Sequence, residues 1–143
     1  MKNRCIGKSI FVTLLLLASV SVAGASGKLL TILSTESQET QMMALVLTTQ
    51  AHNQGAEVII LLCGEAGYLA TEKTESRTFE PAGRSPRDLL KHLKDNGVTV
   101  EVCAIFLPQR DLEAGDLWDG VNVARPPEVA ALMMRDDVKL LTF

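Results

Sequence analysis

The sequence predicts a single α/β domain: an open, mostly parallel sheet of five strands with helices on both faces. Short apolar runs alternate with segments of helical periodicity, which is the pattern of parallel strands joined by crossover helices. The runs 57–63 and 98–107 are almost continuously apolar, as expected of strands that are covered on both sides. Serine, proline and glycine stand where helices should begin and end. A length of 143 residues favours one domain.

The N-terminus has the pattern of a secretory signal peptide. Lys2, Arg4 and Lys8 precede an apolar run over 10–22, and small residues at 23–25 follow it. We therefore expect a signal peptide over 1–25, a domain over 26–143 and a periplasmic or secreted protein. The apolar run is short for a bilayer, which takes roughly 20 residues to span, and an uncleaved anchor is the alternative. Cys5 would leave with the leader.

The first half of the domain reads as strand, helix, strand. Residues 29–33 form an apolar run, and the polar residues 34–38 after it offer Ser or Thr caps for a helix. Met42, Leu45, Val46 and Thr49 recur at helical spacing, and the helix should end before Gly55. The strand 57–63 follows, and 64–67 break it. Residues 71–85 are polar, and an ordinary surface loop is preferred to a mobile flap.

The second half continues the alternation. Ser85 and Pro86 are typical of a helix start, the apolar stripe of this helix includes Leu89 and Leu93, and Gly97 should end it. A strand is predicted over 98–107, a short helix over 112–118 and a short strand over 121–124. A helix over 126–134 and a final strand over 138–143 complete the chain.

Charge excludes one class of partner. The chain carries a net charge of −3, and three of its 14 basic residues but none of its 17 acidic residues lie in the predicted leader. The remaining domain is acidic with scattered cations, whereas phosphate binding needs clustered Lys and Arg. We expect no nucleic-acid partner, and no membrane contact once the signal is cleaved.

Familiar cofactor and catalytic motifs are absent from the sequence. It holds no phosphate loop, dinucleotide fingerprint, C-x-x-C dithiol or G-x-S-x-G elbow, so we predict no bound cofactor. We predict no metal site either, since His52 and His92 fall on separate helices. The paired carboxylates lie in polar, turn-like segments and are read as solvated; they are Asp111/Glu113, Asp116/Asp119 and Asp136/Asp137.

Cys103 is the remaining candidate for chemistry. It lies toward the carboxyl end of the strand 98–107, and sheets of this kind bind ligands beyond the carboxyl ends of their strands. A thiol reacts as thiolate, and a nearby cation lowers its pKa. Arg110, just past the turn at Pro108, could supply that cation. The alternative is a buried cysteine that behaves as a small apolar residue.

Cys63 is the second thiol of the domain, at the end of the strand 57–63. With a strand order of 2-1-3-4-5, the first strand would separate it from Cys103 by two strand spacings, roughly 9–10 Å. That exceeds the roughly 7 Å between Cα atoms that an unstrained disulfide can bridge. Cys63 is therefore read as structural in preference to a resolving thiol, and stays a weak second candidate for the site.

Several segments resemble one family. The strand and turn over 100–110 are similar to the cysteine-bearing segment of the DsrE/DsrF-like family, which includes the TusD sulfur-relay subunit. Residues 61–68 resemble the second strand of that family and its loop, and 119–124 and 137–143 resemble the closing strands. The resemblance covers nearly all of 28–143.

The resemblance implies a flavodoxin-like three-layer sandwich, assembled as trimers or hexamers. It implies that Cys103 takes sulfane sulfur as a persulfide from a donor protein or small thiol and passes it to an acceptor. The first hypothesis is therefore an exported sulfur carrier or thiol-redox protein. The second is a non-catalytic, oligomeric binding module that holds a small ligand or a protein, with Leu117 and Trp118 as candidate contacts and a core position as the alternative for Trp118. Whether the protein is an enzyme stays open.

Overall fold

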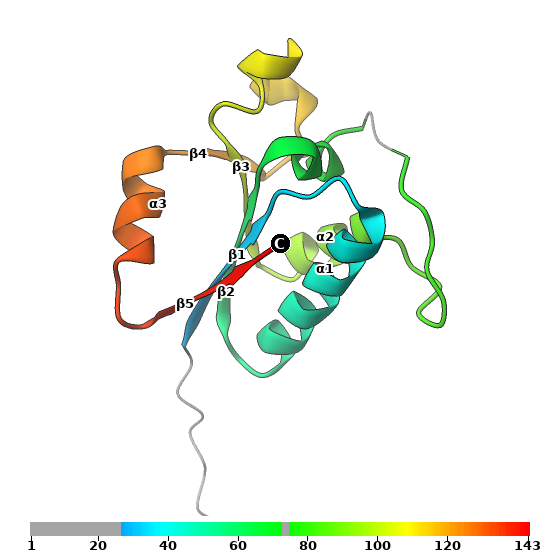
Figure 1. Cartoon of the computed structure of the whole chain (residues 1–143), viewed down its shortest axis with the longest axis horizontal. Coiled ribbons are helices and arrows are strands. Elements are labelled where there is room, and N and C mark those ends of the chain that lie inside the picture. Colours follow the sequence, from blue (N-terminus) through cyan, green and yellow to red (C-terminus); the bar gives the residue numbers. More distant parts are fainter. Residues whose placement is uncertain (1–26, 73–74) are drawn as a thin grey trace, which may run out of the picture.

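The fold is a five-stranded, all-parallel sheet with helices on both faces. The structure is a computed structural model that describes residues 27–72 and 75–143. The strands are β1 (Lys28–Leu33), β2 (Glu57–Leu62), β3 (Thr99–Cys103), β4 (Asn122–Ala124) and β5 (Val138–Thr142), in the order β4-β3-β2-β1-β5. The predicted α/β class is confirmed, and the five strands lie in the predicted places (Figure 1).

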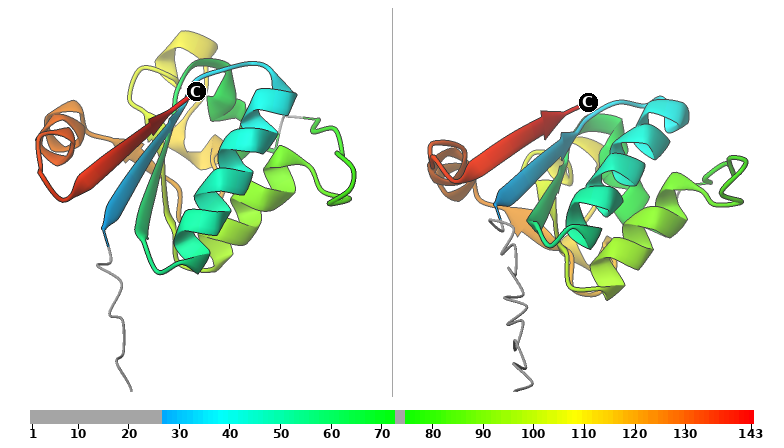
Figure 2. Two further views of the ribbon diagram at one scale, coloured as in Figure 1. Left: turned by 60° about the horizontal axis from the view of Figure 1, so that its bottom comes forward. Right: turned by 90° about the horizontal axis from the view of Figure 1, so that it is seen from below.

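The direction in which the sheet grows determines which face each helix covers. From β1 the chain adds β2, β3 and β4 outward in one direction, and the crossover helices α1 (Gln38–Asn53) and α2 (Pro86–Asp95) lie side by side on one face (Figure 2). The chain then returns through α3 (Pro126–Met133) to the far edge, where β5 pairs with β1. Since parallel crossovers are right-handed, reversing the direction places α3 on the opposite face.

The main core lies between the sheet and the α1–α2 layer. Alternate residues of β2 and β3 point into it, together with the apolar stripes of both helices. These side chains are almost fully buried, among them Ile60, Leu62, Val100, Val102, Leu45, Leu90 and Leu93. Burying a side chain of this size contributes about 1.5–3 kcal/mol, so this layer carries most of the hydrophobic stabilisation.

The α3 face of the sheet is covered more thinly. Its buried cluster contains only Leu30, Leu61 and Ala124, with Val129 and Leu132 of α3 packed against it. No residue of α3 is itself buried. One short helix therefore shields this face, and apolar side chains of β4, β5 and α3 stay open to solvent.

Local signals in the sequence explain the helix starts. The Ser37 hydroxyl accepts a hydrogen bond from the Thr40 N–H at the start of α1. At α2, Ser85 and Asp88 form a reciprocal capping box, and Pro86 occupies the first turn. The predicted caps in the segment 34–38 and at Ser85 are thus confirmed.

The predicted strand order is wrong. The predicted order has β1 between β2 and β3, whereas β2 and β3 are directly hydrogen-bonded neighbours. The periodicity of an apolar run reports that a strand is buried but does not identify its neighbour.

Two predicted boundaries also differ from the structure. The strand predicted over 98–107 ends at Cys103, because the chain turns at once and the Phe106 N–H donates to the Cys103 carbonyl. The helix predicted over 112–118 is a single 3₁₀ turn, η3 (Ala114–Asp116). Cys103 is therefore the last residue of its strand.

The segment predicted as a surface loop is anchored to both helices of the α1–α2 layer. The Gln38 amide donates to the Glu75 carbonyl, and its oxygen accepts from the Arg77 N–H. The Arg87 N–H donates to the Ser76 hydroxyl.

The predicted signal peptide over 1–25 falls outside the described residues. Within 27–72 and 75–143, no helix has the length and apolar character needed to cross a bilayer.

Candidate functional site

Cys103 and Cys63 lie beside one another at the carboxyl edge of the sheet. Leu62 of β2 is in register with Val102 of β3, and each cysteine is the next residue of its chain segment. Both point to the α3 face, since Cys63 packs against the cluster around Leu61 and Cys103 is in register with Ala124 of that cluster. Both are free thiols and partly exposed.

This adjacency corrects the predicted separation of the two thiols. Neighbouring strands lie about 4.8 Å apart, half the distance expected when β1 was thought to intervene. Disulfides join Cα atoms that lie about 4.4–6.8 Å apart. The geometric reason for reading Cys63 as purely structural is therefore gone.

The Cys63 thiol holds its proton more tightly than an ordinary thiol does. Burial, the charge of Cys103 and a hydrogen bond to Cys103 together raise the pKa of Cys63 to about 11. The site therefore favours the protonated Cys63 thiol, whose S–H can donate to the Cys103 sulfur. A thiol donor of this kind stabilises a neighbouring thiolate without any cation.

Arg110 lies on the short turn η2 (Pro108–Arg110) that follows Cys103. Its guanidinium donates to the Glu65 carboxylate at 2.6 Å and lies 4.6 Å from the centre of the Phe106 ring. It also lies 5.4 Å from the centre of the Tyr68 ring. The cation is thus engaged by residues of the loops that follow the two cysteines, and its action on the Cys103 thiolate stays a prediction.

The same contacts fasten the two cysteine loops to each other. The 3₁₀ helix η1 (Gly64–Ala70) begins directly after Cys63 and carries Glu65, Gly67 and Tyr68. Phe106, which is 1% exposed, packs edge-on against Tyr68 with ring centres 5.2 Å apart. No local pattern in the sequence predicts the contacts of Glu65 and Phe106, although both residues lie close to a cysteine in the chain.

Helix α3 starts close to Cys103 but offers it no hydrogen-bond donors. Ala124, the register partner of Cys103, is followed by the N-cap Arg125. Pro126 and Pro127 lack N–H groups, and the next two N–H groups donate to the Arg125 carbonyl. Only the helix dipole is left to favour an anion there.

An acidic side chain shares the face of Cys103. Glu101 precedes it on β3, and burial, followed by the charge of Glu128 on α3, raises the pKa of Glu101. The α3 face beside Cys103 thus carries two neighbouring carboxyl groups, those of Glu101 and Glu128.

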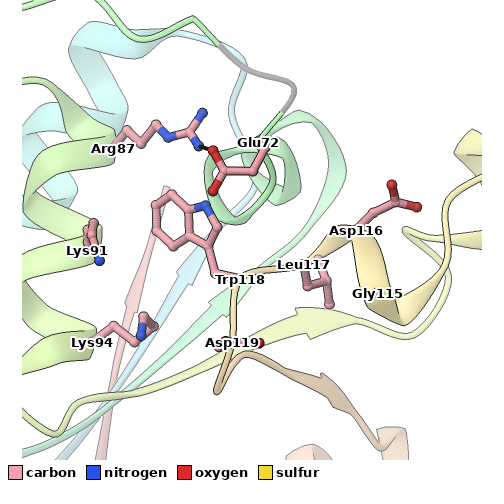
Figure 3. Close-up of a pocket in the computed structure, with 9 residues that line it drawn as sticks. All are labelled: Glu72, Arg87, Lys91, Lys94, Gly115, Asp116, Leu117, Trp118 and Asp119. Carbon is pink, nitrogen blue, oxygen red and sulfur yellow. Dashed lines mark hydrogen bonds and ion pairs between the residues drawn. The ribbon is translucent and has the colours of Figure 1, made fainter.

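A separate cavity of about 710 Å³ lies between α2 and the loop before β4 (Figure 3). Arg87, Lys91 and Lys94 of α2 line one side, and Leu117, Trp118 and Asp119 line the other. The Arg87 guanidinium lies 5.0 Å from the centre of the Trp118 ring and pairs with Glu72 at 2.8 Å. Both candidate contact residues from the sequence, Leu117 and Trp118, therefore lie at a cavity.

The cavity wall on α2 is cationic, but its charges are partnered. Lys91 and Lys94 both pair with Asp95, at 3.1 Å and 3.2 Å. Among the residues that the structure describes, no three His, Cys, Asp or Glu side chains gather as a metal site would require.

Comparisons with known proteins agree on the fold. The model of the DsrE/DsrF-like family matches residues 28–143. The crystal structure of the ychN protein from E. coli superposes with a TM-score of 0.68 and 20% sequence identity, over 82% of this chain and 99% of that chain. A protein of unknown function from Methanobacterium thermoautotrophicum, MTH1491, superposes with a TM-score of 0.59 and 12% identity, over the same shares of the two chains. The search of curated proteins gave no match.

Proposed function

Because the chain belongs to the DsrE/DsrF-like family, we propose that it carries sulfane sulfur on the Cys103 thiol and passes it from a donor to an acceptor. The family is associated with sulfur relay. The observation that carries the proposal is the position of Cys103, a partly exposed thiol at the carboxyl end of β3 beside a second thiol that holds its proton.

The transfer consists of two exchange steps. The Cys103 thiolate attacks the outer sulfur of a donor persulfide, the donor leaves as a thiolate, and Cys103 becomes Cys–S–SH. An acceptor thiolate then attacks that outer sulfur, and Cys103 leaves as a thiolate. Each step exchanges one S–S bond for another, so it needs thiolate character and access but no cofactor.

Mass spectrometry of the intact protein tests this proposal. In a Cys5→Ser background, incubation with a small-molecule persulfide should add the mass of one sulfur atom at Cys103. Cys63→Ser should keep this adduct, whereas Cys103→Ser should lose it. Alkylation of Cys103 no faster than that of free cysteine, with no sulfur retained by Cys63→Ser, would refute the proposal.

Self-association is part of the proposed function. Large apolar side chains stay exposed on the α3 side of the sheet, including Met134 at 84% and Leu140 of the edge strand β5 at 46%. Monomers seldom leave such a surface open, and a second copy of the chain would cover it. We expect a trimer or hexamer in light scattering, and Leu140→Lys should lower the molar mass. An unchanged molar mass would show that other surfaces hold the assembly.

Export is proposed from the leader pattern alone. We expect signal peptidase to cleave after Ala25, which places the carrier in the periplasm or medium. N-terminal sequencing of the protein recovered from a bacterial periplasm should begin at Ser26. An intact leader on protein in the membrane fraction would instead support the anchor.

The Trp118 cavity favours a second candidate function, the binding of a small organic anion. Its volume suits a compact ligand, and cations of α2 face an aromatic ring across it. Trp118 is the only tryptophan of the chain, so its fluorescence reports directly on the cavity. The flat anion 8-anilinonaphthalene-1-sulfonate should quench it, less so in Lys91→Gln/Lys94→Gln and equally in Cys103→Ala. Equal quenching in the lysine variant would exclude this site.

A further inference from the structure

Cys63 and Cys103 lie on neighbouring strand ends, at a spacing that a disulfide can bridge. The two residues continue the in-register pairing of β2 with β3, and both side chains lie on the α3 face. Their Cα atoms are thus about one strand spacing apart, inside the range that disulfides bridge.

The backbone around each sulfur is fixed by hydrogen bonds. The Cys63 N–H donates to the Leu33 carbonyl at 2.8 Å, and the Cys103 carbonyl accepts from the Phe106 N–H at 2.9 Å. The Arg110–Glu65 ion pair then joins the loops that follow the two cysteines. These contacts therefore hold the two cysteine-bearing segments next to each other.

We propose that Cys63 is a resolving thiol, which attacks a sulfur adduct on Cys103 and closes a reversible Cys63–Cys103 disulfide. For a Cys103 persulfide, which rests on the proposed function, the Cys63 sulfur bonds to the inner sulfur while the S–SH bond breaks. The outer sulfur leaves as hydrosulfide and takes up the Cys63 proton as hydrogen sulfide. Two thiol sulfurs are oxidised to a disulfide and the sulfane sulfur is reduced. A dithiol reductant then restores both thiols and leaves as its own disulfide.

The order of events follows from the environment of Cys63. While Cys103 is a thiolate, Cys63 donates a hydrogen bond to it and keeps its proton, so Cys63 stays out of the first step. Once the Cys103 sulfur is bonded to another sulfur, its charge and the hydrogen bond no longer hold that proton. Burial still disfavours the Cys63 thiolate, so resolution follows capture with a delay.

The persulfide on Cys103 therefore has a limited lifetime. An acceptor that arrives early receives the sulfane sulfur from Cys103. Without an acceptor, the sulfur is released as hydrogen sulfide, and the protein stays in the disulfide form until a dithiol reduces it. The reaction that must follow is therefore a thiol–disulfide reduction of this protein.

The test uses the full chain with Cys5→Ser, so that Cys63 and Cys103 are its only thiols. Glutathione disulfide is added first, because the mixed disulfide it forms needs no sulfane chemistry. The Cys5→Ser protein that keeps both Cys63 and Cys103 should form the disulfide, so its intact mass should fall by two hydrogens and it should retain no glutathione. It should also run as a monomer in a denaturing, non-reducing gel. Cys63→Ser should retain one glutathione at Cys103. A stable glutathione adduct on the wild-type pair would overturn the proposal.

A persulfide donor is used in the second arm. The wild-type pair should release about one hydrogen sulfide per disulfide formed, and Cys63→Ser should hold its extra sulfur at least tenfold longer. If Cys63→Ser takes up no sulfur while the glutathione arm succeeds, the carrier function fails and the resolving thiol stands. Cys63→Ala repeats both arms with a smaller apolar side chain, and thermal unfolding of each variant verifies that it is folded.

Discussion

The ring of Phe106 lies so close to the backbone of Gly67 that a β-carbon at residue 67 would come within 2.5 Å of it. Gly67 belongs to the loop after Cys63 and Phe106 to the turn after Cys103. The absence of one methyl group thus lets the two cysteine loops pack against each other.

Gly67→Ala should therefore destabilise the protein and disturb the site. The added methyl group would displace a ring that is almost fully buried, and overpacking of this kind costs about 1–3 kcal/mol. Urea denaturation measures the loss of free energy of unfolding. Gly115→Ala is the matched control, because a β-carbon there meets no atom within 4 Å. Equal effects of the two substitutions would contradict the proposed close packing.

Arg110 and Glu65 should be energetically coupled. Their side chains are 18% and 51% exposed, so solvent screens the ion pair and a coupling of about 0.5–1 kcal/mol is expected. A double-mutant cycle with Arg110→Gln and Glu65→Gln measures this coupling from the free energies of unfolding. Purely additive effects would mean that the pair contributes nothing to joining the loops.

The Cys63 thiol should make stability fall at high pH. Its pKa is raised to about 11 in the folded protein, so the unfolded chain loses this proton at lower pH than the folded one. The contribution is complete below the ordinary thiol pKa of about 8.5, and it is lost as the pH rises toward 11. Urea denaturation across this range should show a steeper decline for the wild type than for Cys63→Ala. Parallel curves would contradict the raised pKa.

Glu101→Gln should stabilise the protein at neutral pH. Burial, followed by the charge of Glu128, raises the pKa of Glu101, so the fold favours the protonated carboxyl. The stability that this protonated carboxyl contributes is lost as the pH rises through the raised pKa. An amide avoids this cost, and a gain of about 1–3 °C in Tm is expected for a partly exposed group. The gain should vanish below about pH 4, where the carboxyl is protonated in both states. A gain that is independent of pH would point to packing instead.

Much of the fold could be predicted from local patterns. Ser37 and Ser85 as caps, Pro86 and Pro126 at helix starts and the five apolar runs all correspond to elements of the structure. Each of these signals depends on neighbours in the chain, so a single sequence is sufficient to read it. The end of β3 was missed because 104–107 stay apolar while the backbone turns, and Phe106 and Leu107 are buried there.

The site was predicted less completely. Cys103 was predicted as the candidate, but Cys63 was expected two strand spacings away from it. The contacts of Arg110 with Glu65 and Phe106 were not predicted. These relationships join segments that are far apart in the chain. No periodicity or spacing within either segment contains information about the other.

The amino-acid sequence by itself determined the alternation of strands and helices, the acidic character of the domain and the presence of a thiol in each of two apolar runs. The tertiary structure alone decided that those two runs are neighbours. An apolar run indicates a buried strand without identifying its neighbour, so local hydrophobicity cannot choose between the two strand orders. Only the folded chain pairs β2 directly with β3, and this pairing brings the two cysteines to about one strand spacing.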